Sequence, residues 1–229
     1  MKTDCVLHDK LKKPLNSIKS GVLIGICGAA GSGKSCLVIN LLTKKKENKE
    51  KMGLYKCFNE IFIVSPSMKS FNNDIFESVD ATFKYDNLLD FLNNYEEQLI
   101  EEDDEYLIIF DDIGSQIRTQ QCMVAFNKLI HNRRHKHMTI ILLVQNLTMI
   151  PPAIRDSINM LICFKPKTLV ERELIYDYTG LHKKYLIPFY KYMFQEKHDS
   201  MLIDMTLNHS SDYEFYRNIF NKITFNMKD

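Results

Sequence analysis

One short segment constrains the fold of this chain more than any other. Residues 28–35 read GAAGSGKS and match the pattern G-x-x-x-x-G-K-[ST]. An apolar run at 22–27 precedes the segment, and a helix-like pattern follows it from Lys34 to about Thr43. Glycines allow such a loop to curl with its N–H groups turned inward, where they and the N-terminus of the next helix bind phosphate. The sequence therefore predicts a strand, a phosphate-binding loop and a helix, in that order.

Two side chains of this loop carry specific expectations. Lys34 is expected to reach the β- and γ-phosphates of a nucleotide, and the Ser35 hydroxyl is expected to bind Mg²⁺. A glycine-rich turn without a ligand is the alternative, and the position between a strand and a helix speaks against it. The predicted nucleotide-binding residues are Gly28, Ala29, Ala30, Gly31, Ser32, Gly33, Lys34 and Ser35.

The chain alternates apolar runs with helix-like segments as far as Phe164. Strands that are apolar throughout indicate a sheet buried on both faces, and intervening helices indicate parallel crossovers. We therefore predict an α/β fold, with a mainly parallel central sheet between two layers of helices. Ligands of such sheets bind beyond the carboxyl ends of the strands. The later apolar runs are 61–64, 106–110, 139–144 and 159–164, and helical patterns follow Asp86 and include Met123, Phe126 and Ile130.

The pattern is weaker towards the C-terminus. Thr168 and Gly180 suit the start and stop of a helix, and 201–207 alternates as a strand does. A terminal helix is predicted from the spacing of Tyr213, Tyr216 and Phe220. The predicted domains are an N-terminal extension (1–20), a phosphate-loop domain (21–207) and a C-terminal tail or helix (208–229).

A pair of carboxylates follows the apolar run 106–110. A carboxylate at the end of a strand beside the phosphate loop supplies a second Mg²⁺ anchor, often through water, and we assign this role to Asp111. Asp112 is the candidate general base for the water that attacks the γ-phosphate. The alternatives for Asp112 are a helix N-cap and a second metal anchor.

Gln145 ends the run 139–144. Its amide is suited to contact both the γ-phosphate and the attacking water, which would make it a sensor of the γ-phosphate. The alternative is a glutamine that merely starts a loop.

The densest basic stretch is 131–137, which precedes the Gln145 strand. Arg133, Arg134 and Lys136 are candidate contacts to DNA phosphates, whereas the alternative is a set of cations that complements a helix C-terminus. Arg155 is a candidate arginine that reaches the γ-phosphate of a neighbouring subunit, with a surface ion pair as the alternative. Arg133 and Arg134 are rival candidates for that role.

Composition limits which binding partners and which cellular compartment are expected. The formal charge of +1 provides no bulk field for nucleic acid, so any such binding must come from a local patch. The six cysteines show no metal or redox spacing, and we interpret them as small buried hydrophobes in a reducing compartment. No apolar stretch approaches the roughly 18 residues of a membrane span, so no membrane insertion and an intracellular, soluble protein are expected.

Taken together, four blocks resemble a known family. They are GAAGSGKS (28–35), LIIFDDIG (107–114), the Arg134-His135 step leading into MTIILLVQN (138–146), and IPPAIRDSINMLICF (150–164). Their order and spacing resemble the genome-packaging ATPases of large nucleocytoplasmic DNA viruses, the poxvirus-type branch of the FtsK–HerA superfamily. The resemblance covers roughly 21–164. The phosphate loop is generic, whereas the double Asp followed by the Arg-His, strand and Gln block is much more specific.

This resemblance implies a P-loop NTPase fold of the ASCE/RecA-like type, with the Gln145 strand between the phosphate-loop strand and the Asp111 strand. It implies an ATP- and Mg²⁺-dependent motor that moves double-stranded DNA into a preformed capsid. A homo-oligomeric ring and contacts with capsid or portal proteins are further implications, as is a place in the host cytoplasm at sites of virion assembly or with the virion. Many cellular members carry Glu where this chain has Asp112.

Two other functions stay open at this point. A P-loop nucleotide or nucleoside kinase fits the size, but it usually needs an arginine-rich lid, and few arginines follow Arg155. A nucleotide-gated assembly or scaffolding subunit is the second, although such a switch needs no positioned base such as Asp112.

Overall fold

In the part of the chain that the structure describes, a nine-stranded sheet forms the centre, with the strand order β3-β2-β4-β5-β1-β6-β7-β8-β9. This computed structural model describes residues 21–43, 54, 57–67, 82–98, 104–181, 183–206, 213–219 and 221–223. The parallel strands are β1 (Leu23–Cys27), β2 (Glu60–Val64), β3 (Thr82–Tyr85), β4 (Tyr106–Asp111), β5 (Met138–Val144) and β6 (Met160–Phe164). The antiparallel strands are β7 (Ser200–Asp204), β8 (Glu214–Arg217) and β9 (Asn221–Ile223). The predicted α/β class with a mainly parallel sheet is confirmed.

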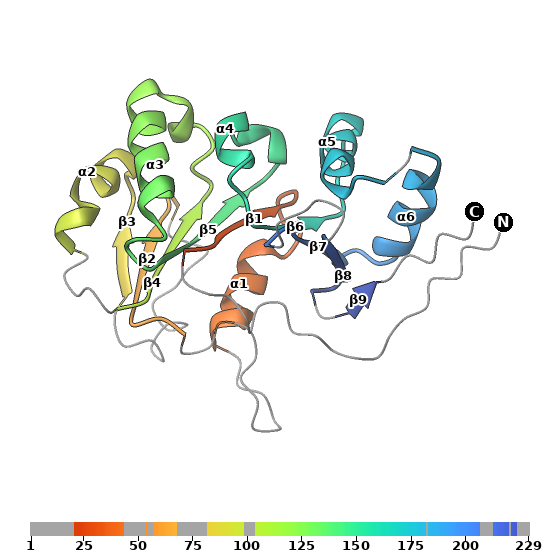
Figure 1. Ribbon diagram of the computed structural model, residues 1–229, viewed down its shortest axis with the longest axis horizontal. Helices are drawn as coiled ribbons and strands as arrows, with labels where there is room; N and C mark the ends of the chain where they lie inside the picture. The colour runs from red at the N-terminus through yellow and green to blue at the C-terminus, as the bar shows by residue number, and fades with distance from the viewer. Residues whose placement is uncertain are drawn as a thin grey trace.

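Helices cover both faces of this sheet. Helix α1 lies against one face beside β1, and α2 to α5 cover the opposite face (Figure 1). Helix α6 packs through Phe189 and Met193 into the same core as α3 and α5. The helices are α1 (Lys34–Thr43), α2 (Leu88–Gln98), α3 (Gln120–Asn132), α4 (Pro152–Arg155), α5 (Leu169–Thr179) and α6 (Leu186–Met193), with 3₁₀ turns η4 (Gln116–Arg118), η5 (Leu147–Met149) and η6 (Lys183–Tyr185). None of these described helices is long and apolar enough to cross a membrane.

The pleat of each central strand explains why its sequence is apolar throughout. In β4, Ile108 and Phe110 pack into the core under α2 to α6, whereas Leu107 and Ile109 pack into the core that contains α1. All four side chains are fully buried. Because successive side chains of a strand point to opposite faces, a sheet covered on both faces requires a continuous apolar run.

The helix ends follow the capping chemistry of the sequence. The Thr168 hydroxyl caps α5 by accepting a hydrogen bond from the Glu171 N–H, and the Glu171 carboxylate reaches back to accept one from the N–H of Lys167, the residue before the N-cap. Gly180, with φ of 62°, ends the same helix as predicted. Helix α2 differs by one residue from the expectation, because Asn87 rather than Asp86 accepts hydrogen bonds from its first turn.

The predicted C-terminal helix is wrong. Residues 214–217 form strand β8, which pairs with β7 and β9 in the central sheet. Its neighbours Phe215 and Tyr216 are both buried, one in each of the two cores, as happens in a strand with both faces covered. Phe220 and the predicted extension 1–20 lie outside the described residues. The sheet continues to Ile223, so it does not end at the predicted boundary after 207.

The cysteine prediction holds only in part. Cys27, Cys122 and Cys163 are buried, but Cys36 and Cys57 are exposed, and none of these five forms a disulfide. The Sγ atoms of Cys27 and Cys163 lie 3.3 Å apart between β1 and β6.

Arg133 has a structural role in the fold, which differs from the predicted role as a DNA contact or arginine finger. Its side chain is buried and donates hydrogen bonds to the carbonyls of Gly21 (2.9 Å), Ile130 (2.6 Å) and Ser157 (3.4 Å) and to Asn159 Oδ1 (3.3 Å). Asn159 Oδ1 also accepts a hydrogen bond from the Leu23 N–H of β1. The guanidinium therefore ties together the amino ends of β1, β5 and β6 and is not available to DNA.

Replacing Arg133 with alanine is expected to lower the free energy of unfolding by about 3 kcal/mol, because several buried acceptors lose their donor. Urea denaturation measures this change. The matched control is Lys136→Ala, which removes an exposed cation from the same loop and should cost less than about 0.5 kcal/mol. Equal stability of the two variants would contradict the structural role of Arg133.

Candidate nucleotide-binding site

The loop 28–35 curls around the carboxyl end of β1. The Gly28 N–H donates to the Val144 carbonyl of β5 at 3.2 Å, which anchors the start of the loop between the two strands. A Cβ atom at Gly28 would lie 2.7 Å from both Phe164 Cβ and Ser32 Oγ, so only glycine fits there. Gly33 has φ of 108°, a conformation that L-residues rarely adopt. These restraints give the loop a shape that the sequence pattern predicted.

The ammonium of Lys34 lies within this loop. Its Nζ donates to the carbonyls of Gly28 at 2.6 Å and Ala29 at 3.2 Å. Burial lowers the pKa of Lys34, while the negative charges of Asp111 and Asp112 act in the opposite direction. A half-buried cation within a glycine-rich loop at the start of a helix provides an anion-binding position.

The two carboxylates differ in their surroundings. Asp111 is buried at the end of β4, whereas Asp112 is exposed and has φ of 55°. The Asp112 N–H donates to the Leu143 carbonyl at 3.2 Å, which holds the turn against β5. Helix α3 begins later and is capped by Thr119, so Asp112 is no N-cap of that helix. Asp tolerates positive φ better than most residues, and such strain is often stored at functional sites.

Gln145 and Asp112 come together across neighbouring strands. The Gln145 Nε2 lies 3.3 Å from Asp112 Oδ1 and 3.4 Å from Oδ2. Strand β5, which ends just before Gln145, pairs with β4 on one side and with β1 on the other. The expected position of the Gln145 strand between the other two is therefore confirmed. Both side chains are exposed at the same edge of the sheet as the phosphate loop.

The site has an uneven distribution of charge. Burial, reinforced by the charge of Asp112 and partly offset by Lys34, raises the pKa of Asp111 to about 6. At pH 7 Asp111 is therefore mostly ionised, although its carboxylate is poorly solvated. A cation brought to this position would be stabilised by that carboxylate.

The chain offers oxygen donors that fit Mg²⁺ at this position. The buried carboxylate of Asp111 and the half-buried hydroxyl of Ser35 are of the kind that Mg²⁺ prefers. The described residues contain no group of three His, Cys, Asp or Glu side chains that would hold a metal by themselves. An ion here would consequently take its other ligands from phosphate and water, as Mg²⁺ does in nucleotide sites.

Replacing Asp111 with asparagine is expected to stabilise the metal-free protein. The folded state raises the Asp111 pKa from 3.8 to about 6, so it favours the protonated form, and the ionised form costs stability as the pH rises above about 4. At pH 7 Asp111→Asn should therefore raise the free energy of unfolding by about 3 kcal/mol, with little gain at pH 4.

Urea denaturation in the presence of EDTA at both pH values tests this prediction. Asp156→Asn, which changes an exposed carboxylate elsewhere, serves as the control. A variant no more stable than the wild type at pH 7 would contradict the buried, poorly solvated state assigned to Asp111.

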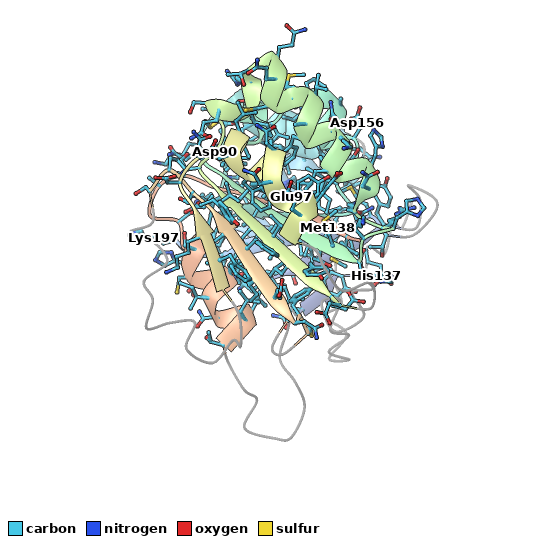
Figure 2. All side chains as sticks on the ribbon, turned by 90° about the vertical axis from the view of Figure 1, so that its left-hand side faces the viewer. Asp90, Glu97, His137, Met138, Asp156 and Lys197 are labelled. Carbon is cyan, nitrogen blue, oxygen red and sulfur yellow. The ribbon has the colours of Figure 1, made fainter. Side chains whose placement is uncertain are left out.

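The basic candidates lie at the other edge of the sheet. Arg134 and Lys136 are exposed in the loop that enters β5, and this loop precedes the amino end of the strand. Figure 2 shows His137 and Met138 far from Lys197, whose neighbour His198 lies 3.1 Å from the Ser32 carbonyl oxygen of the phosphate loop. A strand of seven residues spans roughly 23 Å. These two cations therefore do not take part in the nucleotide site of their own chain.

Arg155 lies on α4, which covers the face of the sheet opposite to α1, the helix that follows the phosphate loop (Figure 1). It ends α4, and the chain then returns to the amino edge, where the Asn159 N–H donates to the Leu23 carbonyl at 2.9 Å. Its neighbour Asp156 lies well away from Lys197 (Figure 2). The Arg155 side chain is half-buried. Burial raises the pKa of Tyr178 to about 12, and the charge of Arg155 partly opposes this shift.

Two residues beside the phosphate loop were not predicted. Phe164, at the end of β6, packs against the loop, and its ring lies 3.7 Å from a Cβ position at Gly33. His198 precedes β7, and its Nδ1 lies 3.1 Å from the Ser32 carbonyl oxygen. Phe164 follows an apolar run, which was a usable signal, whereas no local pattern links His198 to a loop 166 residues away.

The fold and the loop at the end of β1 define a P-loop NTPase fold. Residues 15–210 match the poxvirus A32 protein family. The chain therefore belongs to this family, which confirms the resemblance to the poxvirus-type branch. A comparison with curated proteins found no match.

Solved structures of similar fold include viral packaging proteins. The DNA-packaging ATPase B204 from Sulfolobus Turreted Icosahedral Virus has a TM-score of 0.62 at 16% identity, over 86% of this chain and 98% of that chain. B204 from Sulfolobus turreted icosahedral virus 2 in complex with ATP-gammaS has a TM-score of 0.57 at 16% identity, over 87% and 98%. The pCW3 conjugation coupling protein TcpA has a TM-score of 0.51 at 10% identity, over 90% and 60%. At these identities the similarity shows the fold.

Proposed function

We propose that this protein is an Mg²⁺-dependent ATPase that moves double-stranded DNA into a preformed capsid during virion assembly. The observation that carries the proposal is the contact between Gln145 and Asp112 at the edge that holds the phosphate loop, in a chain of the poxvirus A32 family. The B204 proteins, which share the fold, are described as genome-packaging enzymes. We infer a place at sites of virion assembly in the host cytoplasm, or with the virion.

The arrangement of side chains suggests a division of labour. Lys34 and the loop amides bind the β- and γ-phosphates, and Ser35 and Asp111 would hold Mg²⁺, which would neutralise charge on the phosphates. Asp112 accepts the proton of the attacking water. Gln145, already in contact with Asp112, orients that water and senses the γ-phosphate.

DNA contacts are assigned to the opposite edge of the sheet. The exposed side chains of Arg134 and Lys136 suit phosphate oxygens, which position DNA without reading its sequence. With a formal charge of +1, the chain has no bulk attraction for DNA, so a ring that gathers several such loops around a channel would supply the local field. Capsid or portal proteins are the remaining partners we propose.

The experiment for this function measures phosphate release by the purified protein with Mg–ATP, with and without long linear duplex DNA. We expect turnover to rise with DNA and with protein concentration, because neighbouring subunits complete each site. Electron microscopy under the same conditions is expected to show closed rings around duplex. Turnover that is independent of both DNA and protein concentration would contradict the motor. Phosphate transfer to a nucleoside or nucleotide acceptor would favour a kinase instead.

An arginine supplied in trans gives a further prediction. Arg134 precedes the amino end of β5, and Arg155 lies on α4 across the sheet from α1, so we expect the finger to act on a neighbour's γ-phosphate in a head-to-tail ring. Arg155→Ala and Arg134→Ala should each be tested in mixtures with Asp112→Asn. The variant that lacks the finger should be inactive alone and recover about a quarter of wild-type turnover in a random equimolar mixture with Asp112→Asn.

This fraction follows from the two requirements of each site. Half of the sites keep Asp112, and half of their neighbours carry the arginine. Failure of both arginine variants to lose activity would exclude both as fingers, and loss without recovery in the mixture would place the arginine's action within its own chain.

A further inference from the structure

The turn between α6 and β7 lies against the phosphate loop. His198 Nδ1 is 3.1 Å from the Ser32 carbonyl oxygen, and a Cβ atom at Gly33 would lie 3.8 Å from the same nitrogen. The antiparallel pairing of β6 with β7 explains this placement, because Ser200 is opposite Phe164 at the end of β6. The turn therefore reaches the edge of the sheet where the nucleotide is proposed to bind.

The turn is held in place by a buried carboxylate. Asp199 accepts hydrogen bonds from the N–H groups of Gln195 (2.8 Å) and Glu196 (2.9 Å), from Arg217 Nη2 (2.8 Å) and from Asn218 Nδ2 (2.9 Å). Burial acts to raise the pKa of Asp199, but these hydrogen bonds outweigh burial and lower the pKa to about 2. The carboxylate is thus ionised at neutral pH and fixes the backbone that presents His198.

The contact with His198 constrains the next peptide bond. A carbonyl oxygen only accepts hydrogen bonds, so Nδ1 is the donor. The peptides of the described residues are trans, and in a planar trans peptide the C=O and N–H groups point in opposite directions. When the Ser32 carbonyl faces His198, the Gly33 N–H therefore faces away from it. No backbone carbonyl of the described residues accepts that N–H.

We propose that His198 is a positioning residue for the phosphate loop: it holds the Ser32 carbonyl so that the Gly33 N–H is directed at bound phosphate. This inference rests on the proposed nucleotide function, and it adds a residue from the far end of the chain to the phosphate site. Since His198 acts through the loop backbone, it supports the binding of any polyphosphate, irrespective of the base.

Two substitutions of nearly equal shape test the proposal. His198→Asn keeps an N–H donor at the position of Nδ1, whereas His198→Leu has no donor. Calorimetry should show that His198→Leu weakens the binding of both Mg–ATP and inorganic tripolyphosphate about tenfold, and that His198→Asn restores both to within about threefold of the wild type. Lys34→Ala, which disables the loop directly, is the reference for loss of phosphate binding.

Several results would overturn the proposal. One is a His198→Leu variant that binds both polyphosphates with wild-type affinity. Another is a variant that loses affinity for ATP alone, which would indicate that His198 contacts the adenine base instead. Equally weak polyphosphate binding by the Asn and Leu variants would show that the shape of the imidazole matters and its N–H donor does not. Wild-type protein that binds neither polyphosphate would overturn the proposed function and this inference together.

An NMR measurement on the unsubstituted protein is independent of ligand binding. The neutral His198 imidazole is expected to carry its proton on Nδ1. A proton on Nε2 would show that the ring does not donate to Ser32, and the proposal would fail while the proposed function stood.

Discussion

Replacing Lys34 with alanine is expected to lower the affinity for Mg–ATP at least about 100-fold. In the structure the Lys34 ammonium already lies within hydrogen-bond distance of two loop carbonyls, at the position where phosphates would enter. Removing this cation leaves Asp111 and Asp112 without the charge that opposes them. The triphosphate would then be repelled by the two carboxylates and would no longer be attracted by the lysine.

Calorimetric titration with Mg–ATP measures this loss. Lys191→Ala on α6 removes the same charge from an exposed position and should bind ATP as the wild type does. Unaltered affinity of Lys34→Ala would refute the assignment of residues 28–35 as the nucleotide site. A parallel thermal melt separates a loss of binding from a loss of folding.

Replacing Asp112 with asparagine is expected to reduce kcat about 1,000-fold while ATP still binds. Asparagine has nearly the same shape and also tolerates the positive φ of this position, so the turn should survive. It cannot take a proton from water, however, which is the role of Asp112 in the proposed mechanism. The predicted result is a protein that holds ATP without turning it over.

Single-turnover hydrolysis and ATP binding, measured on the same preparation, test this prediction. Asp156→Asn is again the control for an exposed carboxylate. A protein that only switches shape with ATP should keep its assembly function as Asp112→Asn, whereas a motor should stall. Retention of more than a tenth of the turnover would mean that another group takes the proton.

The sequence was most informative where burial and backbone chemistry act locally. The central strands could be predicted because both of their faces are covered, which leaves no polar positions in runs such as 107–110. The phosphate loop could be predicted because its shape needs glycine at Gly28 and Gly33. The position of Gln145 beside the phosphate loop could be predicted because Gln145 directly follows such a strand.

Elements at the flank of the sheet were harder to recognise. Strand β3 has four residues and an edge position, where Phe83 is exposed yet stacks on Phe62 with ring centroids 5.1 Å apart. Strand β8 pairs with the strands that precede and follow it in the sequence, but the aromatic spacing around Tyr216 was equally compatible with a helix. Pairing across the sheet decided in favour of the strand.

Long-range polar contacts were the least predictable. Arg133 and Arg134 are adjacent in a basic run, but only the first is buried, because its partners come from three separate parts of the chain. His198 gives no signal of its own, since its contact with Ser32 depends on the antiparallel return of β7. Such positions become visible only when the tertiary structure is known.

Strand β5 sets a fixed distance between the loop that carries the proposed DNA contacts and the proposed nucleotide site. It carries Arg134 and Lys136 just before its amino end and Gln145 just after its carboxyl end, and all seven of its residues are buried. Adding or deleting one residue would invert the faces of every side chain beyond that point. In the proposed motor, any signal from a DNA-bound loop to the γ-phosphate must therefore move the whole strand or pass through a neighbouring subunit.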